Sequence, residues 1–166
     1  MKVWRLFWLL ILAAPLGACG FHPLYASGRG HLSGRLAAIY VDPVPESTGY
    51  ELRNTMIDLL GSDGRSAGKA YRLKMTLDEI AQDVAQQSDA SITRYNDTLT
   101  VKYVLTDANG TVLTQGEKTS LSAYNVVKSP YATLVSQQDA DKRAAQDIAA
   151  RIRIDLSIYF DRLGAK

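Results

Sequence analysis

The feature that most restricts the fold is a run of alternating apolar and polar residues around a tight turn. Residues 97–124 read DTLTVKYVLTDANGTVLTQGEKTSLSAY, and the Asn109-Gly110 pair near the middle is a strong hairpin signal. Alternation gives a strand one apolar and one polar face, and the more polar second arm is typical of an edge strand. The segment predicts a β-hairpin. Its expected core residues are Leu99, Val101, Tyr103 and Leu105 on the first arm, and Leu113 and Leu121 on the second.

A short strand and a helix are expected before this hairpin. Residues 36–46 are β-branched and aromatic until two prolines stop the run, which predicts a strand followed by a stiff turn. Ser47 or Thr48 can cap the next helix, with Glu51 near its third position. Gly61 is suited to end this helix.

A third strand and a long helix complete the expected architecture. Residues 70–80 alternate cleanly, and Ser129-Pro130 is a typical helix start. Strand, helix, three strands and helix predict an α+β fold, a two-layer α/β sandwich in which two helices cover one face of a four-stranded mixed sheet. The first two strands are expected to pair in parallel. The apolar stripe of the last helix is Leu134, Ala145, Ile148, Ala149, Ile152, Leu156, Tyr159, Phe160 and Leu163.

Composition and motifs argue against several functions. The 166 residues suit one domain, and a net charge of +2 does not suggest a nucleic-acid partner. Both histidines, His22 and His31, fall in a glycine-rich segment where no packing would fix a catalytic base. The acidic pairs Asp78-Glu79 and Asp139-Asp141 are interpreted as solvated charges. We therefore expect no enzyme and no metal or other cofactor apart from covalent lipid.

The N-terminal segment has the organisation of a secretory signal. Lys2 and Arg5 precede an apolar run closed by small residues. The run is shorter than the about 20 residues that a membrane-spanning helix needs, so cleavage is favoured over a retained anchor helix, which is the alternative. We expect a lipoprotein signal peptide at 1–18, a lipid-anchored tether at 19–35 and one α/β domain at 36–166.

The single cysteine, Cys19, directly follows the leader and has no partner for a disulfide or a metal site. Leu16-Gly17-Ala18-Cys19 resembles the lipobox of bacterial lipoproteins. In that class the cysteine becomes the mature N-terminus and carries an N-acyl chain (palmitate) and an S-diacylglycerol, which together anchor more stably than one chain. With Gly20 next, the resemblance implies an outer-membrane lipoprotein facing the periplasm. A chance cysteine at a generic cleavage site is the alternative.

Cations dominate the polar side of the expected sheet. The outward positions are Arg72, Lys74, Lys102 and Lys118, and Arg94 joins them if no bulge intervenes. A sheet with one helix-covered face has to be polar on the other, so each residue also fits a solvated surface. As a group, clustered cations attract anions and favour a phosphate-bearing ligand. A polar face would equally suit the wet lumen of a porin-sized barrel.

A lipobox cysteine followed at once by GFHPLY, and then by this order of elements, resembles the LPS-assembly lipoprotein family LptE. The segment CGFHPLY at 19–25 is the most specific match. The arm TRYNDTLTVKYVLTDANGTVL and the Ser129-Pro130 helix start continue it. The resemblance implies a non-enzymatic partner of the LptD β-barrel that plugs the barrel, helps it assemble and contacts lipopolysaccharide (LPS) on its way to the outer leaflet.

The resemblance also implies a lipid-binding position. In the family a basic residue at the start of the long hairpin arm is tied to LPS binding, and Arg94 matches it. A second basic position of the family, just inside the last helix, holds Ser136 in this chain, and Lys128 lies nearby out of register. The expected LPS-binding residues are Arg94, Lys102, Arg72, Lys74 and Lys118.

Two other classes of protein stay open at this point. An auxiliary lipoprotein of a phospholipid-transport ABC system shares a lipobox, a small α/β domain and a basic surface. A lipid-anchored hydrolase would have to show turnover that does not depend on the two tether histidines.

Overall fold

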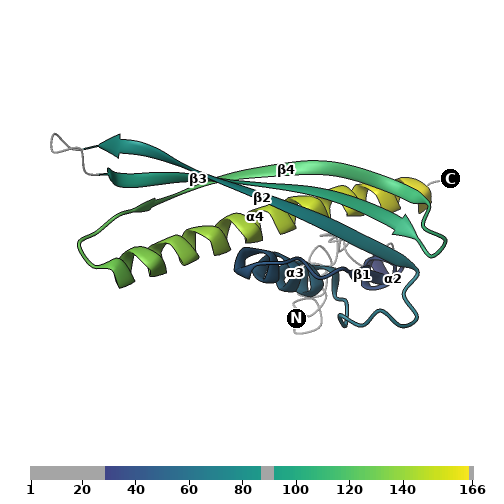
Figure 1. Cartoon of the computed structure of the whole chain (residues 1–166). Helices are drawn as coiled ribbons and strands as arrows, with labels where there is room; N and C mark the ends of the chain where they lie inside the picture. Colours follow the sequence, from purple (N-terminus) through teal and green to yellow (C-terminus); the bar gives the residue numbers. More distant parts are fainter. Residues whose placement is uncertain (1–28, 87–91, 165–166) are drawn as a thin grey trace, which may run out of the picture. The chain divides into compact units, whose positions relative to one another are not determined.

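The computed structural model describes residues 29–86 and 92–164 (Figure 1). The predicted signal peptide, Cys19 with its expected acyl groups and the CGFHPLY segment lie outside the described residues. Contacts separate residues 1–30 from a second unit at 31–166, which contains the sheet. None of the helices in the described part of the chain is both long and apolar enough to cross a membrane.

The described elements follow in the order α2 (Arg29–Ala37), β1 (Ile39–Val41), α3 (Ser47–Leu60), β2 (Tyr71–Gln86), β3 (Ile92–Asp107), β4 (Val112–Asn125) and α4 (Pro130–Gly164). The strands form a four-stranded sheet in the order β1-β2-β3-β4, with β1 parallel to β2 and the other neighbours antiparallel. Figure 1 shows α4 running along the hairpin strands, with α3 beside it. The α+β class, the mixed sheet and the parallel crossover are confirmed. Helix α2 is an addition, in a segment expected to be irregular.

Strands β2 and β3 are longer than the alternation alone indicated, whereas β1 is shorter than the run expected before the two prolines, because that run begins inside helix α2. Strands β2 and β3 each span 16 residues. The predicted turn joins β3 to β4, where Asp107 Oδ1 accepts backbone hydrogen bonds from Asn109 (2.9 Å) and Thr111 (2.8 Å). Gly110 has φ 85°, a left-handed conformation that glycine adopts without strain. The hydrogen bonds from Thr111 and Asn109 hold the pKa of Asp107 below its usual value.

Helix α3 ends as the sequence predicts, but it is capped differently at its start. Helix α3 begins at Ser47, and its N-cap is Glu46, which makes no side-chain capping bond. The expected cap by Ser47 or Thr48 is therefore wrong, and the Thr48 hydroxyl instead donates a hydrogen bond to Glu79 (3.4 Å). Gly61 ends the helix in the left-handed conformation, as predicted.

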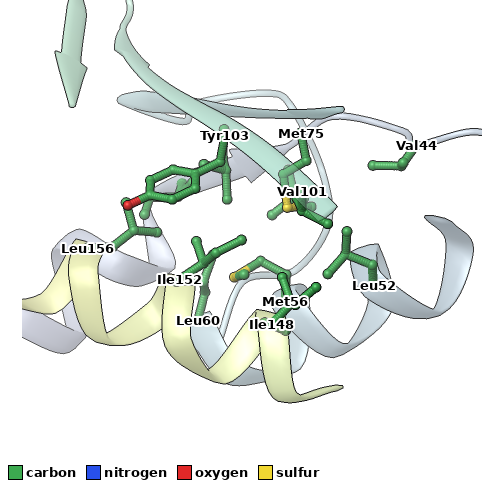
Figure 2. Packing of buried hydrophobic residues seen from close by; sticks show 14 of the residues in the cluster. Val44, Leu52, Met56, Leu60, Met75, Val101, Tyr103, Ile148, Ile152 and Leu156 are labelled. Atoms are coloured by element: carbon green, nitrogen blue, oxygen red, sulfur yellow. The ribbon is translucent and has the colours of Figure 1, made fainter. Parts of the chain in front are cut away.

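Helix α4 supplies the largest share of the apolar layer. Ser129 Oγ accepts a hydrogen bond from the backbone of Ala132 (3.4 Å), which confirms the predicted helix start. Figure 2 shows side chains of α4 meeting those of α3 and the sheet in one cluster. Leu134 and Leu163 are exposed and do not belong to it, contrary to expectation. The buried α4 residues are Ala140, Ala144, Ala145, Ile148, Ala149, Ile152, Leu156 and Phe160.

A β-bulge early in β4 changes which of its side chains face the helices. Leu105 pairs with Thr114 but Thr106 pairs with Val112, so Leu113 is an extra residue. Beyond an extra residue, each side chain points to the face opposite the one that simple alternation predicts. Leu113 is partly buried against the core, as expected, but Leu121 is 66% exposed, so its expected core position is wrong.

Gly116 on β4 allows a close approach of the Tyr103 ring. A Cβ at this position would lie 2.7 Å from the Tyr103 hydroxyl and 2.9 Å from two ring carbons. We expect Gly116→Ala to lower the free energy of unfolding by about 1–3 kcal/mol, because the buried ring has to shift. Urea unfolding of the variant beside wild type measures this. An unchanged midpoint would show that the ring moves freely.

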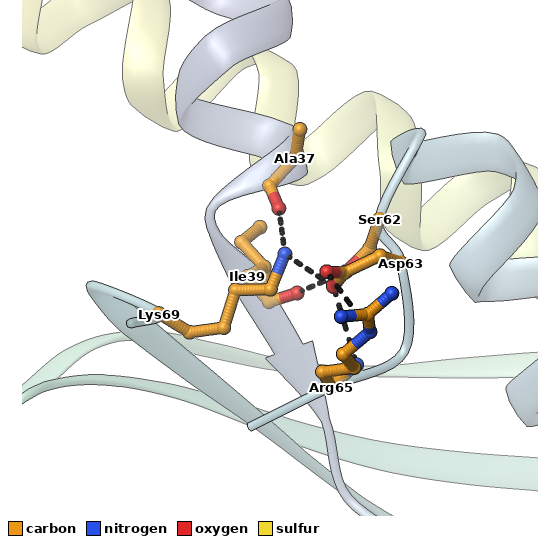
Figure 3. A network of polar contacts seen from close by, with 6 residues as sticks. All are labelled: Ala37, Ile39, Ser62, Asp63, Arg65 and Lys69. Atoms are coloured by element: carbon orange, nitrogen blue, oxygen red, sulfur yellow. Dashed lines mark hydrogen bonds and ion pairs between the residues drawn. The ribbon is translucent and has the colours of Figure 1, made fainter. Parts of the chain in front are cut away.

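A polar network holds the loop between α3 and β2 (Figure 3). Lys69 Nζ donates to the Ala37 carbonyl (2.8 Å) and forms an ion pair with Asp63 (2.8 Å). Ser62 Oγ donates to the Ile39 carbonyl (2.9 Å). The hydrogen bond from Lys69, followed by that from the Arg65 backbone, lowers the pKa of Asp63. The network fixes the crossover that brings β2 beside β1.

Candidate functional site

The face of the sheet that no described helix covers is called the open face below. Its side chains alternate with the buried residues Leu73, Met75, Leu99 and Val101, which face α3 and α4. Cross-strand pairing aligns these outward residues in rows. The rows used below are Lys74 with Val104 and Gln115, Thr76 with Lys102 and Glu117, Asp78 with Thr100 and Thr119, and Ile80 with Thr98 and Leu121.

Three of the predicted cations lie together at one end of the open face. Arg72 forms an ion pair with Asp42 (2.9 Å), and its guanidinium lies 5.3 Å from the centre of the Tyr40 ring. Lys102 lies 3.9 Å from a carboxylate oxygen of Glu117. Both pairs are largely exposed and contribute little to stability. Among the described residues, Lys74 has no carboxylate within ion-pair distance.

Lys74 and Arg72 also line a shallow hollow at the edge of the sheet. Its volume is about 460 Å³, and its wall also includes Tyr40, two prolines and the acidic Asp42, which is paired with Arg72. The two cations beside a concave surface form a place where an anionic group could lie with part of its surface removed from water.

Arg94 shares the open face but lies far from the other cations. The register shifts of the β2–β3 ladder lie between Asp83 and Gln86, and β3 pairs regularly with β4 from Arg94 to Leu105. Arg94 therefore lies on the same face of β3 as Lys102, and it is exposed. Eight residues at about 3.4 Å each place the two about 27 Å apart along the strand. The open face thus carries two separate cationic positions instead of one cluster.

Lys118 is on the opposite face from the one predicted. It pairs across the sheet with the buried Val101, and its Nζ lies 2.7 Å from Asp155 Oδ2 of α4. The Tyr103 hydroxyl donates to the same oxygen (2.6 Å). Burial, followed by the bond to Asp155, raises the pKa of Tyr103. Burial acts to raise the pKa of Asp155, but the bonds from Lys118 and Tyr103 outweigh it and keep that pKa low. The bulge in β4 produces this reversal.

Three carboxyl groups converge between the sheet and α4, where no sequence motif indicates a site. Glu79, Asp97 and Asp141 each place an oxygen within 4.8 Å of the others. Asp97 is 2% exposed. The interpretation of Glu79 and Asp141 as solvated charges is wrong, because both are partly buried. The alternating pattern indicates that two of the three carboxyls face the helices. Glu79 lies on the same side of β2 as Leu77, and Asp97 lies on the same side of β3 as Leu99.

The environment of Glu79 and Asp141 favours the neutral form of their carboxyls. Burial, followed by the proximity of Asp97, raises the pKa of Glu79 to about 7. Burial and then Asp97 likewise raise the pKa of Asp141 to about 7. The same groups act on Tyr124, whose pKa is raised by burial and then by the Asp97 charge. Oxygen donors of this kind could hold a hard cation or share protons.

The chain is similar to known proteins over most of its length. The protein RP188 of Rickettsia prowazekii (strain Madrid E) is 27% identical over 155 residues, which cover 93% of this chain and 96% of that protein. A solved structure of a candidate lipoprotein from Caulobacter crescentus CB15 has a TM-score of 0.67 and 29% identity, covering 80% of this chain and 97% of that one. The rare lipoprotein B from Shewanella oneidensis shares the fold with a TM-score of 0.57 and 10% identity, covering 76% of this chain and 98% of that one.

A family model described as LptE, lipopolysaccharide-assembly, matches residues 36–156. The matched range contains β1 to β4, α3 and most of α4, so it includes the open face and the buried carboxyls. The chain belongs to the LptE lipopolysaccharide-assembly family.

Proposed function

We propose that this chain is an outer-membrane lipoprotein, anchored through acylated Cys19, that occupies the lumen of an LptD-type β-barrel. In this proposal it helps the barrel assemble and contacts LPS during delivery to the outer leaflet. The observation that carries the proposal is the family match over residues 36–156, which spans the whole sheet. The role is non-enzymatic.

The open face has properties that suit a water-filled barrel. Its middle rows present hydroxyl groups, and Thr100 and Thr119 lie within hydrogen-bond distance of each other across the strands (3.3 Å). Hydroxyl groups both donate and accept hydrogen bonds, so they can pair with polar side chains of a barrel lumen. The 16-residue strands β2 and β3 present this surface over about 50 Å.

LPS phosphates would be met by cations of the open face that have no ion-pair partner in the described part of the chain. Lys74 and Arg94 are exposed on the open face, and neither has an ion-pair partner among the described residues. Arg72 and Lys102 belong to the same face, but Asp42 and Glu117 already partly neutralise them. Lys118 is not part of the proposed LPS contact, because it is paired with Asp155 beneath the sheet.

Co-purification tests the proposed partner. The full chain, isolated from outer membrane in a mild detergent, is expected to bring a large β-barrel with it, and its depletion is expected to reduce LPS at the cell surface. Isolation without a barrel, together with unchanged surface LPS, would contradict the proposal. Recovery of inner-membrane permease and substrate-binding subunits would favour the phospholipid-transport alternative.

Charge reversal tests the proposed LPS contact. We expect Lys74→Glu combined with Arg94→Glu to weaken LPS binding about tenfold, because two exposed attractions become repulsions. The matched control is Lys142→Glu combined with Arg162→Glu, which changes net charge equally at exposed positions of α4, off the open face. Binding of labelled LPS to the purified chains measures both. Equal losses would show a general charge effect and no local site.

A further inference from the structure

The buried carboxyls of Glu79, Asp97 and Asp141 lack a positive counterpart. They come from β2, β3 and α4, and their nearest oxygens lie within 4.8 Å of one another. None of the ion pairs in the described part of the chain includes any of the three. Burying several like charges without a cation is strongly unfavourable, so either protons or a cation must reside there.

Two of the three carboxyls also have a buried oxygen without a hydrogen-bond partner. Asp97 is 2% exposed, and its Oδ1 is buried without a hydrogen-bond partner. Asp141 Oδ1 and Ser122 Oγ are also buried and unpartnered, and Ser122 is the direct cross-strand neighbour of Asp97. Native proteins leave few buried polar atoms unpaired, so the unpaired carboxyl oxygens indicate that a proton or a cation resides beside them.

We propose that Glu79, Asp97 and Asp141 bind a divalent cation, Ca²⁺, between helix α4 and the sheet. Oxygens that share a Ca²⁺ at about 2.3–2.6 Å can be at most about 5 Å apart, and the three carboxyls meet this condition. The set contains only oxygen donors, with no nitrogen or sulfur, which selects Ca²⁺ or Mg²⁺ over Zn²⁺. Ca²⁺ is favoured because it accepts many protein oxygens in flexible geometry, whereas Mg²⁺ usually retains several waters.

A groove gives the ion a route to the site. It has a volume of about 520 Å³ and is lined by residues of α3 and α4 that include Thr48 and Asp141. Asp141 is the one carboxyl of the three that lines the groove, and Thr48, which also lines it, donates a hydrogen bond to Glu79. Water in the groove can complete the coordination, and the bound ion would hold the first half of α4 to β2 and β3. This site is separate from the open face and does not depend on the proposed role in LPS assembly.

Calcium titration of the full chain tests the site. The chain is purified in a mild detergent, stripped of metals with a chelator and titrated with CaCl₂ at pH 7.5 by calorimetry. We expect one equivalent to bind, and the thermal midpoint to rise by about 5–10 °C when free Ca²⁺ is about 100 times its Kd. No binding heat and no midpoint shift at 10 mM Ca²⁺ would overturn the proposal.

Two variants separate a cation site from carboxyls that only share protons. Asp97→Asn and Asp141→Asn keep the side-chain shape, and we expect each to weaken Ca²⁺ binding at least tenfold. Asp78→Asn is the matched control, because Asp78 neighbours Glu79 but lies exposed on the open face. Without Ca²⁺ the Asp97→Asn variant should be at least as stable as wild type, and with Ca²⁺ it should be less stable. An equal Ca²⁺ response in wild type, Asp97→Asn and Asp141→Asn would contradict the site.

Discussion

Ile152→Ala is expected to lower the free energy of unfolding by about 2–5 kcal/mol. The side chain is fully buried on α4, in the cluster where α3, α4 and the sheet meet (Figure 2). Its removal loses the transfer free energy of three carbon atoms and leaves a cavity that helices on one side and a sheet on the other cannot fully close. For a domain with about 5–15 kcal/mol of stability this is a large fraction. Urea unfolding followed by circular dichroism measures it.

The control for this prediction is Ile154→Ala on the same helix. Ile154 is 53% exposed, so its replacement removes little buried surface and is expected to change stability by less than about 0.5 kcal/mol. The change of residue type is identical, and only the direction of the side chain differs. Similar effects at both positions would mean that α4 does not pack through the described face.

The metal-free chain is expected to lose about 2 kcal/mol of stability as the pH rises from 5 to 8. Burial raises the pKa values of Glu79 and Asp141 to about 7. In the unfolded chain both carboxyls ionise near pH 4. Between these values the folded state binds more protons than the unfolded state, so the free energy of unfolding falls with rising pH. Solvent at the groove screens part of this effect, so the loss of stability is smaller than the full pKa differences imply.

Unfolding at pH 5 and pH 8, with a chelator present, measures the pH dependence. Asp141→Asn removes one titrating group of the cluster and is expected to flatten the profile. The charged and titratable neighbours Glu46, Asp97 and Tyr124 remain in that variant. The lowered pKa values of Asp63, Asp107 and Asp155 stabilise the fold equally at pH 5 and pH 8, because this contribution is lost only as the pH falls below about 4. Stability that rises between pH 5 and pH 8 would contradict the predicted cluster.

Much of the fold could be predicted because its signals are local. Alternation, the Asn109-Gly110 turn, the Gly61 helix end and the Ser129-Pro130 helix start each act within a few residues of the chain. These signals were sufficient for the α+β class and for the helix-facing side of β2 and β3. The parallel pairing of β1 with β2 followed from the helix between them.

The candidate sites depended on features that alternation does not report. One extra residue in β4 reverses every later side chain, which is why Lys118 lies under the sheet and Leu121 outside it. Arg94 was placed on the correct face, but its distance from Lys102 depends on the uninterrupted length of β3. A bulge is a small local irregularity with a large effect on which side chains can act together.

The sequence by itself determined the order of strands and helices, because hydrophobic period and turn chemistry are encoded by neighbouring residues. It also carried the family resemblance, which the match over residues 36–156 confirmed. Only the tertiary structure decided which charges meet. Glu79 and Asp97 have the parity of core residues in the sequence, but their convergence with Asp141 arises because two strands and a helix that are distant along the chain pack against one another.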